Sequence, residues 1–215
     1  MTTPTIVENP LKQLTRFGQS IWLDYIRRSL MTSGELKRLI EQDGLGGMTS
    51  NPTIFEKAIT GGSEYDDQLA QLRQDKSLDA KAIYERLAIR DIQDAADILR
   101  PVYDGTRKRD GFVSLEVAPF LANETQPTID EARRLWKTVD RPNVMIKVPG
   151  TSEGAAAARR LLADGINVNI TLLFSLDAYA AVIESYLAAL EERAKRGLPL
   201  STIASVASFL SLIHI

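Results

Sequence analysis

Residues 145–150 read Met-Ile-Lys-Val-Pro-Gly, a short apolar run that encloses one lysine, Lys147, and closes with Pro-Gly. Such a run predicts a strand buried on both faces, as in a parallel sheet. Burial disfavours the charged form of a lysine, and the free amine is a nucleophile that condenses with carbonyl compounds. The alternative is a structural lysine that extends to the strand end or pairs with a carboxylate. The rest of the sequence decides between these two interpretations.

Five further segments have the apolar content and the flanking turn residues that predict strands. They cover residues 20–26, the start of 46–55, 112–117, 165–174 and 202–209. Helices are predicted between them, over residues 10–17 after a cap at Asn9, 33–44, 63–110, 128–139, from Ser152 onward, and after a cap at Ser175 up to Gly197. Pro101 is expected to interrupt the long helix near its end. Thr128 and Glu131 have the spacing of a capping box.

Alternating strands and helices predict an α/β protein with a parallel sheet and helical crossovers. Such a sheet closes into a (β/α)8 TIM barrel or stays open and doubly wound. No Gly-x-Gly-x-x-Gly follows the first strand, which disfavours the nucleotide-binding open sheet. The sequence therefore predicts a single (β/α)8 barrel domain over residues 1–215, incomplete because about six of its eight strands are present.

Composition excludes several classes of function. The 215 residues are 44% hydrophobic and 25% charged, with a formal net charge of −2 and a pI near 5.6. These values give no basic surface for nucleic acid or for an anionic membrane. No apolar run approaches the ~20 residues of a membrane span, and the N-terminus lacks the pattern of a signal peptide. A cytoplasmic location is predicted.

The sequence contains no cysteine, and its one histidine, His214, is next to last. Thiol nucleophiles, cysteine-ligated zinc and a Ser-His-Asp triad are therefore disfavoured. An enzyme with this composition must use lysine, carboxylates, hydroxyls and amides.

Polar residues occur inside or just after each predicted strand, where barrel enzymes carry their catalytic groups. The candidates are Asp24, Asn51, Glu116, Lys147, Asn169, Thr171 and Ser208. Each has a structural alternative; for example, Asp24 is also typical of a strand end and Asn51 of a helix cap. Six strands that each place polar groups at such positions favour one shared pocket.

Three blocks of the sequence resemble one enzyme family. Residues 47–55, Gly-Met-Thr-Ser-Asn-Pro-Thr-Ile-Phe, are similar to the signature of the transaldolases. Residues 144–149 resemble the strand that carries their Schiff-base lysine, and residues 169–175 resemble a third block. The resemblance extends from about the first strand to Phe209. The long insert between the second and third strands is most similar to the bacterial branch that also occurs fused to a glucose-6-phosphate isomerase.

The resemblance implies transfer of a dihydroxyacetone unit between phosphosugars in the non-oxidative pentose phosphate pathway. By matching positions, Lys147 forms the Schiff base with sedoheptulose 7-phosphate or fructose 6-phosphate. Asp24 takes the proton from the donor hydroxyl, and Glu116 exchanges protons through a water that Thr171 helps to hold. The substrate-binding residues are implied to be Asn51 and Asn169 on the dihydroxyacetone hydroxyls, and Ser208 near the phosphate.

The chemistry is consistent with the composition. A protonated imine stabilises the carbanion left after carbon–carbon cleavage, so no metal or organic cofactor is required. Carboxylates must transfer the protons, because histidine is missing from the candidate set. Desolvation and neighbouring carboxylates act on the charge of Lys147 in opposite directions. The sequence leaves open which effect is larger.

The end of the chain departs from the family pattern. Ile213 stands where the family has an arginine that binds the substrate phosphate, and the later strands are absent. We expect a truncated or frameshifted reading frame with a non-native tail over residues 210–215. An unclosed sheet exposes unpaired strand edges and leaves voids, so the chain alone is expected to be poorly soluble and inactive.

Two alternatives stay open. One is a related Schiff-base aldolase that releases free dihydroxyacetone, although such enzymes are shorter and lack the long helical insert. The other is a non-catalytic remnant that binds a sugar phosphate or pairs with another chain. The sequence also leaves open whether the full-length form is a homo-oligomer and whether an isomerase domain follows.

Overall fold

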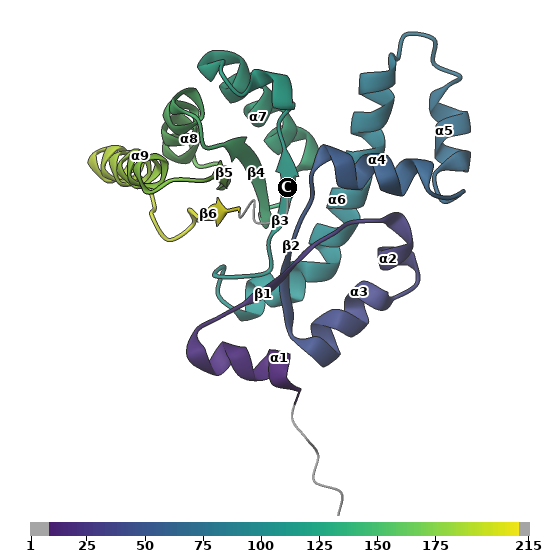
Figure 1. The fold of residues 1–215 in the computed structure, drawn as a ribbon, viewed down its shortest axis with the longest axis horizontal. Helices are drawn as coiled ribbons and strands as arrows, with labels where there is room; N and C mark the ends of the chain where they lie inside the picture. The colour runs from purple at the N-terminus through teal and green to yellow at the C-terminus, as the bar shows by residue number, and fades with distance from the viewer. Residues whose placement is uncertain (1–8, 211–215) are drawn as a thin grey trace, which may run out of the picture. The chain divides into compact units, whose positions relative to one another are not determined.

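The computed structural model describes residues 9–210 (Figure 1). The chain divides into two compact units, with the boundary between Val113 and Ser114. The predictions made for residues 1–8, Ile213 and His214, and for residues 211–215 of the tail, lie outside the described part.

The first unit contains the first two strands and the long helical insert. Its elements are α1 (Pro10–Gln13), η1 (Leu14–Phe17), β1 (Ile21–Asp24), α2 (Arg28–Thr32), α3 (Glu35–Arg38), η2 (Leu39–Asp43), β2 (Leu45–Thr49), α4 (Pro52–Thr60), α5 (Asp66–Leu72) and α6 (Ala80–Gly105). β1 and β2 are parallel, and Met48 of β2 is the register partner of Val113.

The second unit contains the candidate lysine. It begins within β3 (Val113–Glu116) and continues with η3 (Pro119–Leu121), α7 (Thr125–Val139), β4 (Val144–Pro149), α8 (Ser152–Asp164), β5 (Val168–Leu173), α9 (Leu176–Lys195) and β6 (Ser205–Phe209). β4 pairs with β5 and β5 with β6, both in parallel. In Figure 1, α7, α8 and α9 follow one another along this unit.

The strands occur in the sheet in chain order, β1 to β6, with helical segments between successive strands. This is the topology of a (β/α)8 barrel, and residues 9–210 supply six of its eight strands. The predicted fold class is confirmed.

Several helix starts and ends follow the chemistry that the sequence predicts. Asn9 accepts a hydrogen bond from the Leu11 amide at the start of α1, and Ser175 accepts one from the Ala178 amide at the start of α9. Gly44 ends the predicted 33–44 segment in the left-handed conformation. These contacts satisfy backbone groups that a helix end leaves unpaired.

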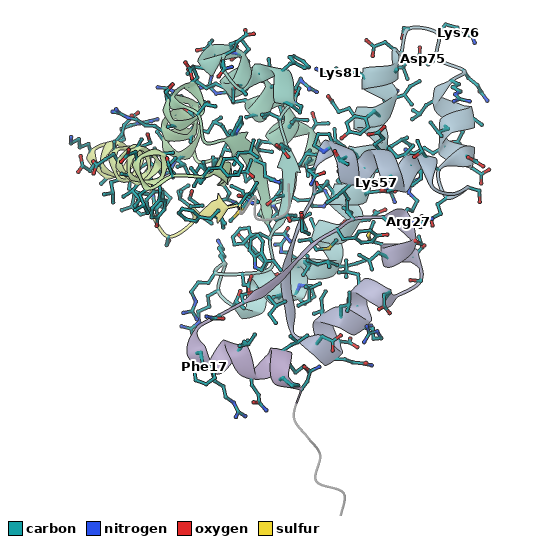
Figure 2. All side chains as sticks on the ribbon, viewed as in Figure 1. Phe17, Arg27, Lys57, Asp75, Lys76 and Lys81 are labelled. Carbon is teal, nitrogen blue, oxygen red and sulfur yellow. The ribbon has the colours of Figure 1, made fainter. Side chains whose placement is uncertain are left out.

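Four local predictions are wrong. The segment 63–110 is two helices, α5 and α6, joined by a turn that contains Asp75 and Lys76 (Figure 2). The Asp75 side chain accepts from Ser77 in this turn, and Asp79 caps α6, so local hydrogen bonds compete with a continuous helix. Pro101 does not interrupt α6, which continues to Gly105.

The third error concerns the start of α7. The helix begins at Thr125, so Thr128 lies inside it and is not a cap. Its hydroxyl donates instead to the Leu121 carbonyl, a buried bond to the preceding segment. The fourth error is the helix start predicted at Ser33. Helix α3 instead begins after Gly34, which has the left-handed conformation.

Within residues 9–210, none of the helices combines the length and the apolar content needed to cross a membrane.

Candidate active site

Lys147 occupies a strand in which every residue is buried, as the sequence predicts. Its neighbours Ile146 and Val148 are fully buried, and its own side chain is only 9% exposed. An ammonium removed from water is costly unless a counter-charge lies close to it. The strand therefore holds the Lys147 amine in a site where a partner is needed.

That partner comes from the neighbouring strand. The Nζ atom of Lys147 lies 3.4 Å from Oε2 of Glu116, the last residue of β3, whose side chain is 13% exposed. The Val117 amide donates to the Lys147 carbonyl at 3.1 Å, so the backbones are joined next to the ion pair. An amine and a carboxylate at this distance can exchange protons directly or through one water.

Asn169 of β5 is hydrogen-bonded to residues of β3 and β6 in the second unit. It is fully buried and is the register partner of Lys147. Its Nδ2 donates to the Ser114 hydroxyl at 3.1 Å, and its Oδ1 accepts from the Ser208 hydroxyl at 2.8 Å. These two bonds fix the orientation of the amide, which a residue that binds hydroxyl groups requires.

Thr171 lies two residues further along β5, opposite Pro149. It is 4% exposed, and its carbonyl accepts from the Gly150 amide at 2.7 Å. Asn167, the residue before β5, donates to the carbonyls of Pro142 and Val144. Asn167 therefore joins β5 to the start of β4.

The first unit carries the other two candidates. Asp24 is the last residue of β1 and is exposed, and its Oδ1 accepts from the Thr49 hydroxyl at 2.6 Å. Asn51 caps α4, because its Oδ1 accepts from the Ile54 amide at 2.9 Å and Pro52 opens the helix. Both structural interpretations, a strand-end carboxylate and a helix cap, are thus observed.

The structure brings five of the seven candidates together in the second unit, and the first unit carries Asp24 and Asn51. The five are Glu116, Lys147, Asn169, Thr171 and Ser208.

Two polar partners were not among the predicted site residues. Ser114 lies two residues before Glu116, and the two-residue period of a strand places both on one face. Thr49 lies two residues before Asn51 within the signature block. Strand periodicity applied backward from Glu116 is the signal that finds Ser114. Thr49 follows only from the register of β2 with β1, in which it is the partner of Asp24.

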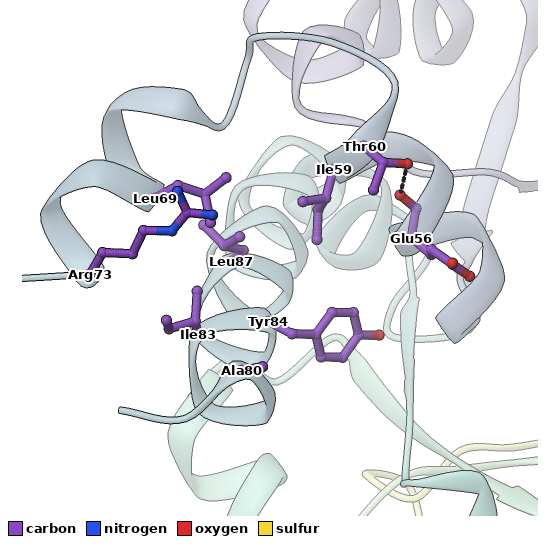
Figure 3. Close-up of a pocket in the computed structure, with 9 residues that line it drawn as sticks. All are labelled: Glu56, Ile59, Thr60, Leu69, Arg73, Ala80, Ile83, Tyr84 and Leu87. Atoms are coloured by element: carbon purple, nitrogen blue, oxygen red, sulfur yellow. Dashed lines mark hydrogen bonds between the residues drawn. The ribbon is translucent and has the colours of Figure 1, made fainter. Parts of the chain in front are cut away.

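A pocket of about 420 Å³ lies elsewhere, among α4, α5 and α6 of the first unit (Figure 3). Ile59, Leu69, Ile83 and Leu87 make its surface largely apolar, and none of the seven candidates lines it. Among residues 9–210 no cluster of three or more acidic or histidine side chains is arranged to hold a metal ion.

Comparison with known proteins identifies the family. Residues 21–211 match the family model described as transaldolase/fructose-6-phosphate aldolase. The chain is 50% identical to transaldolase 2 of Nostoc sp. over 202 residues, which are 94% of this chain and 52% of that protein. It is 50% identical to the Thermobifida fusca transaldolase over 94% of this chain and 54% of the relative. It is 48% identical to the Thiobacillus denitrificans transaldolase over 95% of this chain and 57% of that relative.

The chain thus spans about half the length of the curated relatives that it matches. The family match covers the strand of Lys147, the strand of Glu116 and the signature block around Asn51. This chain belongs to the transaldolase/fructose-6-phosphate aldolase family.

Proposed function

We propose that this chain carries the Schiff-base lysine of a transaldolase. The enzyme transfers a dihydroxyacetone unit from sedoheptulose 7-phosphate or fructose 6-phosphate to glyceraldehyde 3-phosphate or erythrose 4-phosphate, in the cytoplasm. The observation that supports this most directly is the buried Lys147 amine, 3.4 Å from the Glu116 carboxylate. A buried amine beside one carboxylate suits imine chemistry, in which the nitrogen is neutral when it attacks and positive in the product.

The first half of the reaction forms the imine. The Lys147 amine adds to the donor carbonyl to give a carbinolamine, and the carbinolamine loses water to give the iminium. Glu116 supplies the proton that leaves with this water and accepts the proton that the nitrogen loses, through a water held by Thr171. General acid–base help of this kind contributes about 10²–10⁴ in rate.

The second half breaks and remakes a carbon–carbon bond. Asp24 takes the proton of the donor hydroxyl, the bond breaks, and the electron pair moves into the iminium to give an enamine on Lys147. The aldose leaves, the enamine attacks the acceptor aldehyde, and Asp24 returns its proton to the new alkoxide. Water then hydrolyses the product iminium, which releases the new ketose phosphate and the free Lys147 amine. Asn51 and Asn169 bind the dihydroxyacetone hydroxyls, and Ser208 lies near the phosphate. The bonds from Asn169 to Ser114 and Ser208 support a binding role for its amide.

Residues 1–215 alone form the imine but do not complete the transfer, in this proposal. Ile213 replaces the arginine implied for phosphate binding, and the chain spans about half of its relatives. The two steps therefore need separate measurements.

Borohydride reduction tests the imine directly. The chain is incubated with fructose 6-phosphate and borohydride, digested, and analysed by mass spectrometry. We expect a reduced adduct on Lys147, none in Lys147→Ala, and an undiminished yield in Lys195→Ala, which alters an exposed lysine. An adduct on another lysine refutes the assignment.

A second candidate is cleavage without transfer, because the matching family model includes fructose-6-phosphate aldolase. In the full-length protein, product formation with and without erythrose 4-phosphate separates the two. Transfer without release of free dihydroxyacetone supports the transaldolase, and release alone supports the aldolase.

A further inference from the structure

Leu172 has a backbone conformation that leucine rarely adopts. Its φ is +63°, in the left-handed region, although it lies within β5. The other non-glycine residues with positive φ among residues 9–210 are Arg107, Lys108 and Asp140, which follow helix ends. A left-handed residue is ordinary after a helix but unusual in a strand, because Cβ crowds the following carbonyl.

This conformation belongs to a bulge. Ile170 pairs with Ala207 and Leu173 pairs with Phe209, so β5 has two residues, Thr171 and Leu172, where β6 has one, Ser208. Bulges bend a strand and change the direction of its side chains, and they are over-represented near active sites.

The bulge reverses the alternation at the end of β5. Val168 and Ile170 are 0% and 1% exposed, and a regular strand would turn Leu172 to the same buried face. Instead Leu172 is 45% exposed and Leu173 is fully buried. The bulge therefore leaves the side chain of Leu172 partly exposed, next to the buried candidate residue Thr171.

Gly150 holds the bulge from the neighbouring strand. Its amide donates to the Thr171 carbonyl at 2.7 Å. A Cβ added to Gly150 would lie 2.5 Å from Cδ2 of Leu173 and 3.1 Å from the Thr171 oxygen. The contact is thus built for a glycine, and it fixes the peptide between Thr171 and Leu172.

We propose that the left-handed conformation of Leu172 orients Thr171 for the proton transfers at Lys147, which makes Leu172 a positioning residue. This proposal rests on the proposed function. Strained residues persist when the surrounding structure determines them, and here the Gly150 bond to the Thr171 carbonyl and the pairing of Leu173 with Phe209 hold the residues on either side of Leu172.

Three substitutions separate the backbone conformation from the side chain. Leu172→Val disfavours the left-handed region, because the branched Cβ increases the clash. Leu172→Asn and Leu172→Gly tolerate that region but lack the leucine side chain. Asp140→Val is the matched control, since it places the same branched residue at a left-handed position after α7.

Three quantities are measured on each variant of the whole chain: amide hydrogen exchange, borohydride trapping and the urea midpoint of unfolding. Amide hydrogen exchange at Gly150 reports the bond to Thr171, and the rate of borohydride trapping of fructose 6-phosphate reports the chemistry at Lys147. We expect Leu172→Val to accelerate exchange and to slow trapping by about tenfold or more. Leu172→Asn and Leu172→Gly should keep the exchange rate at Gly150 and the trapping rate at Lys147 within about twofold of wild type. Both should raise the urea midpoint, because they tolerate the left-handed region better than leucine. Asp140→Val should lower the urea midpoint alone.

If Leu172→Val does not fold, Gly150→Ala replaces it, because the added methyl group displaces the Thr171 carbonyl from the β4 side. Unchanged trapping in Leu172→Val, or in this replacement, overturns the proposal. Trapping in Leu172→Asn as slow as in Leu172→Val also overturns it, because the side chain would then be what matters. A wild-type chain that traps no adduct refutes the proposed function and this proton-transfer role. The exchange at Gly150 would still tell whether Leu172 holds Thr171.

Discussion

The Lys147 amine and the Glu116 carboxylate form a close ion pair between β4 and β3, with both side chains largely removed from solvent. Each group is costly to bury alone, so the pair satisfies a physical requirement of the fold before it serves any reaction. It also places an acid–base group beside the only buried lysine among residues 9–210.

Replacing the Glu116 carboxylate should separate its contribution to stability from its contribution to the chemistry at Lys147. Glu116→Gln keeps the shape but removes the charge and the proton-transfer group, so we expect the trapping rate at Lys147 to fall by about 10²–10⁴. Loss of one partner of a buried pair should also lower the free energy of unfolding, by about 3 kcal/mol. Trapping kinetics and urea unfolding measure the two effects. Glu192→Gln, at an exposed ion pair with Arg196, should change neither substantially. Equal trapping rates in Glu116→Gln and wild type would remove Glu116 from the mechanism.

The bonds around Asn169 should be coupled energetically. Asn169→Ala leaves the Ser114 and Ser208 hydroxyls without this partner and creates a void, so it should cost about 2–4 kcal/mol. Ser208→Ala should cost about 1 kcal/mol. Urea unfolding of both variants and of the double variant gives the coupling, which we expect to exceed about 0.5 kcal/mol. Strict additivity would mean that the Asn169–Ser208 bond contributes nothing.

Asp91 should make the stability of the first unit depend on pH. Its carboxylate is fully buried, accepts from the Tyr65 hydroxyl at 2.7 Å and pairs with Arg28 at 2.8 Å. Burial raises the pKa of Asp91 above its ordinary value of 3.8, despite the opposing hydrogen bond from Tyr65 and charge of Arg28. The folded chain therefore binds this proton more tightly than the unfolded chain. The contribution of Asp91 to stability decreases as pH rises from the ordinary pKa of 3.8 to the raised pKa of the folded chain.

The variant Asp91→Asn isolates this effect, because it cannot titrate. The difference in unfolding free energy between wild type and Asp91→Asn should fall as pH rises from about 3.8 to the raised pKa. The fall should be about 1.4 kcal/mol for each pKa unit of the shift, with no further change above it. Urea unfolding between pH 3 and pH 7 measures it. A difference that grows with pH would show that the ion pair with Arg28 outweighs burial.

The chain alone should self-associate through the end of the second unit. Among the described residues β6 pairs with β5 only, and Leu176, Phe209 and Leu210 are 80%, 53% and 45% exposed. An unpaired edge with apolar side chains promotes association. Phe209→Lys should reduce association at least about tenfold in analytical ultracentrifugation, whereas Phe17→Ser, at an exposed residue of the first unit, should reduce it less. A monomeric wild-type chain with a sharp unfolding transition would contradict this prediction.

The strands were predictable from sequence because each is a short apolar run closed by turn residues. Residues 144–149 and 168–173 are strands close to the predicted bounds, 145–150 and 165–174. The helical errors arise where two local structures compete. Hydrogen bonds to the side chains of Asp75 and Asp79 form between the two helices, from the amides of Ser77 and Ala82. The spacing of apolar residues does not predict these bonds.

The sequence by itself determined the fold class, the family and the identity of the buried lysine, since those depend on local patterns and on motifs that are contiguous in the chain. Only the tertiary structure decided which carboxylate pairs with Lys147, that Ser114 and Ser208 hold Asn169, and that Leu172 takes a left-handed conformation. The reason is that strand register sets all three. Register brings residues dozens of positions apart within hydrogen-bonding distance, and no local pattern encodes it.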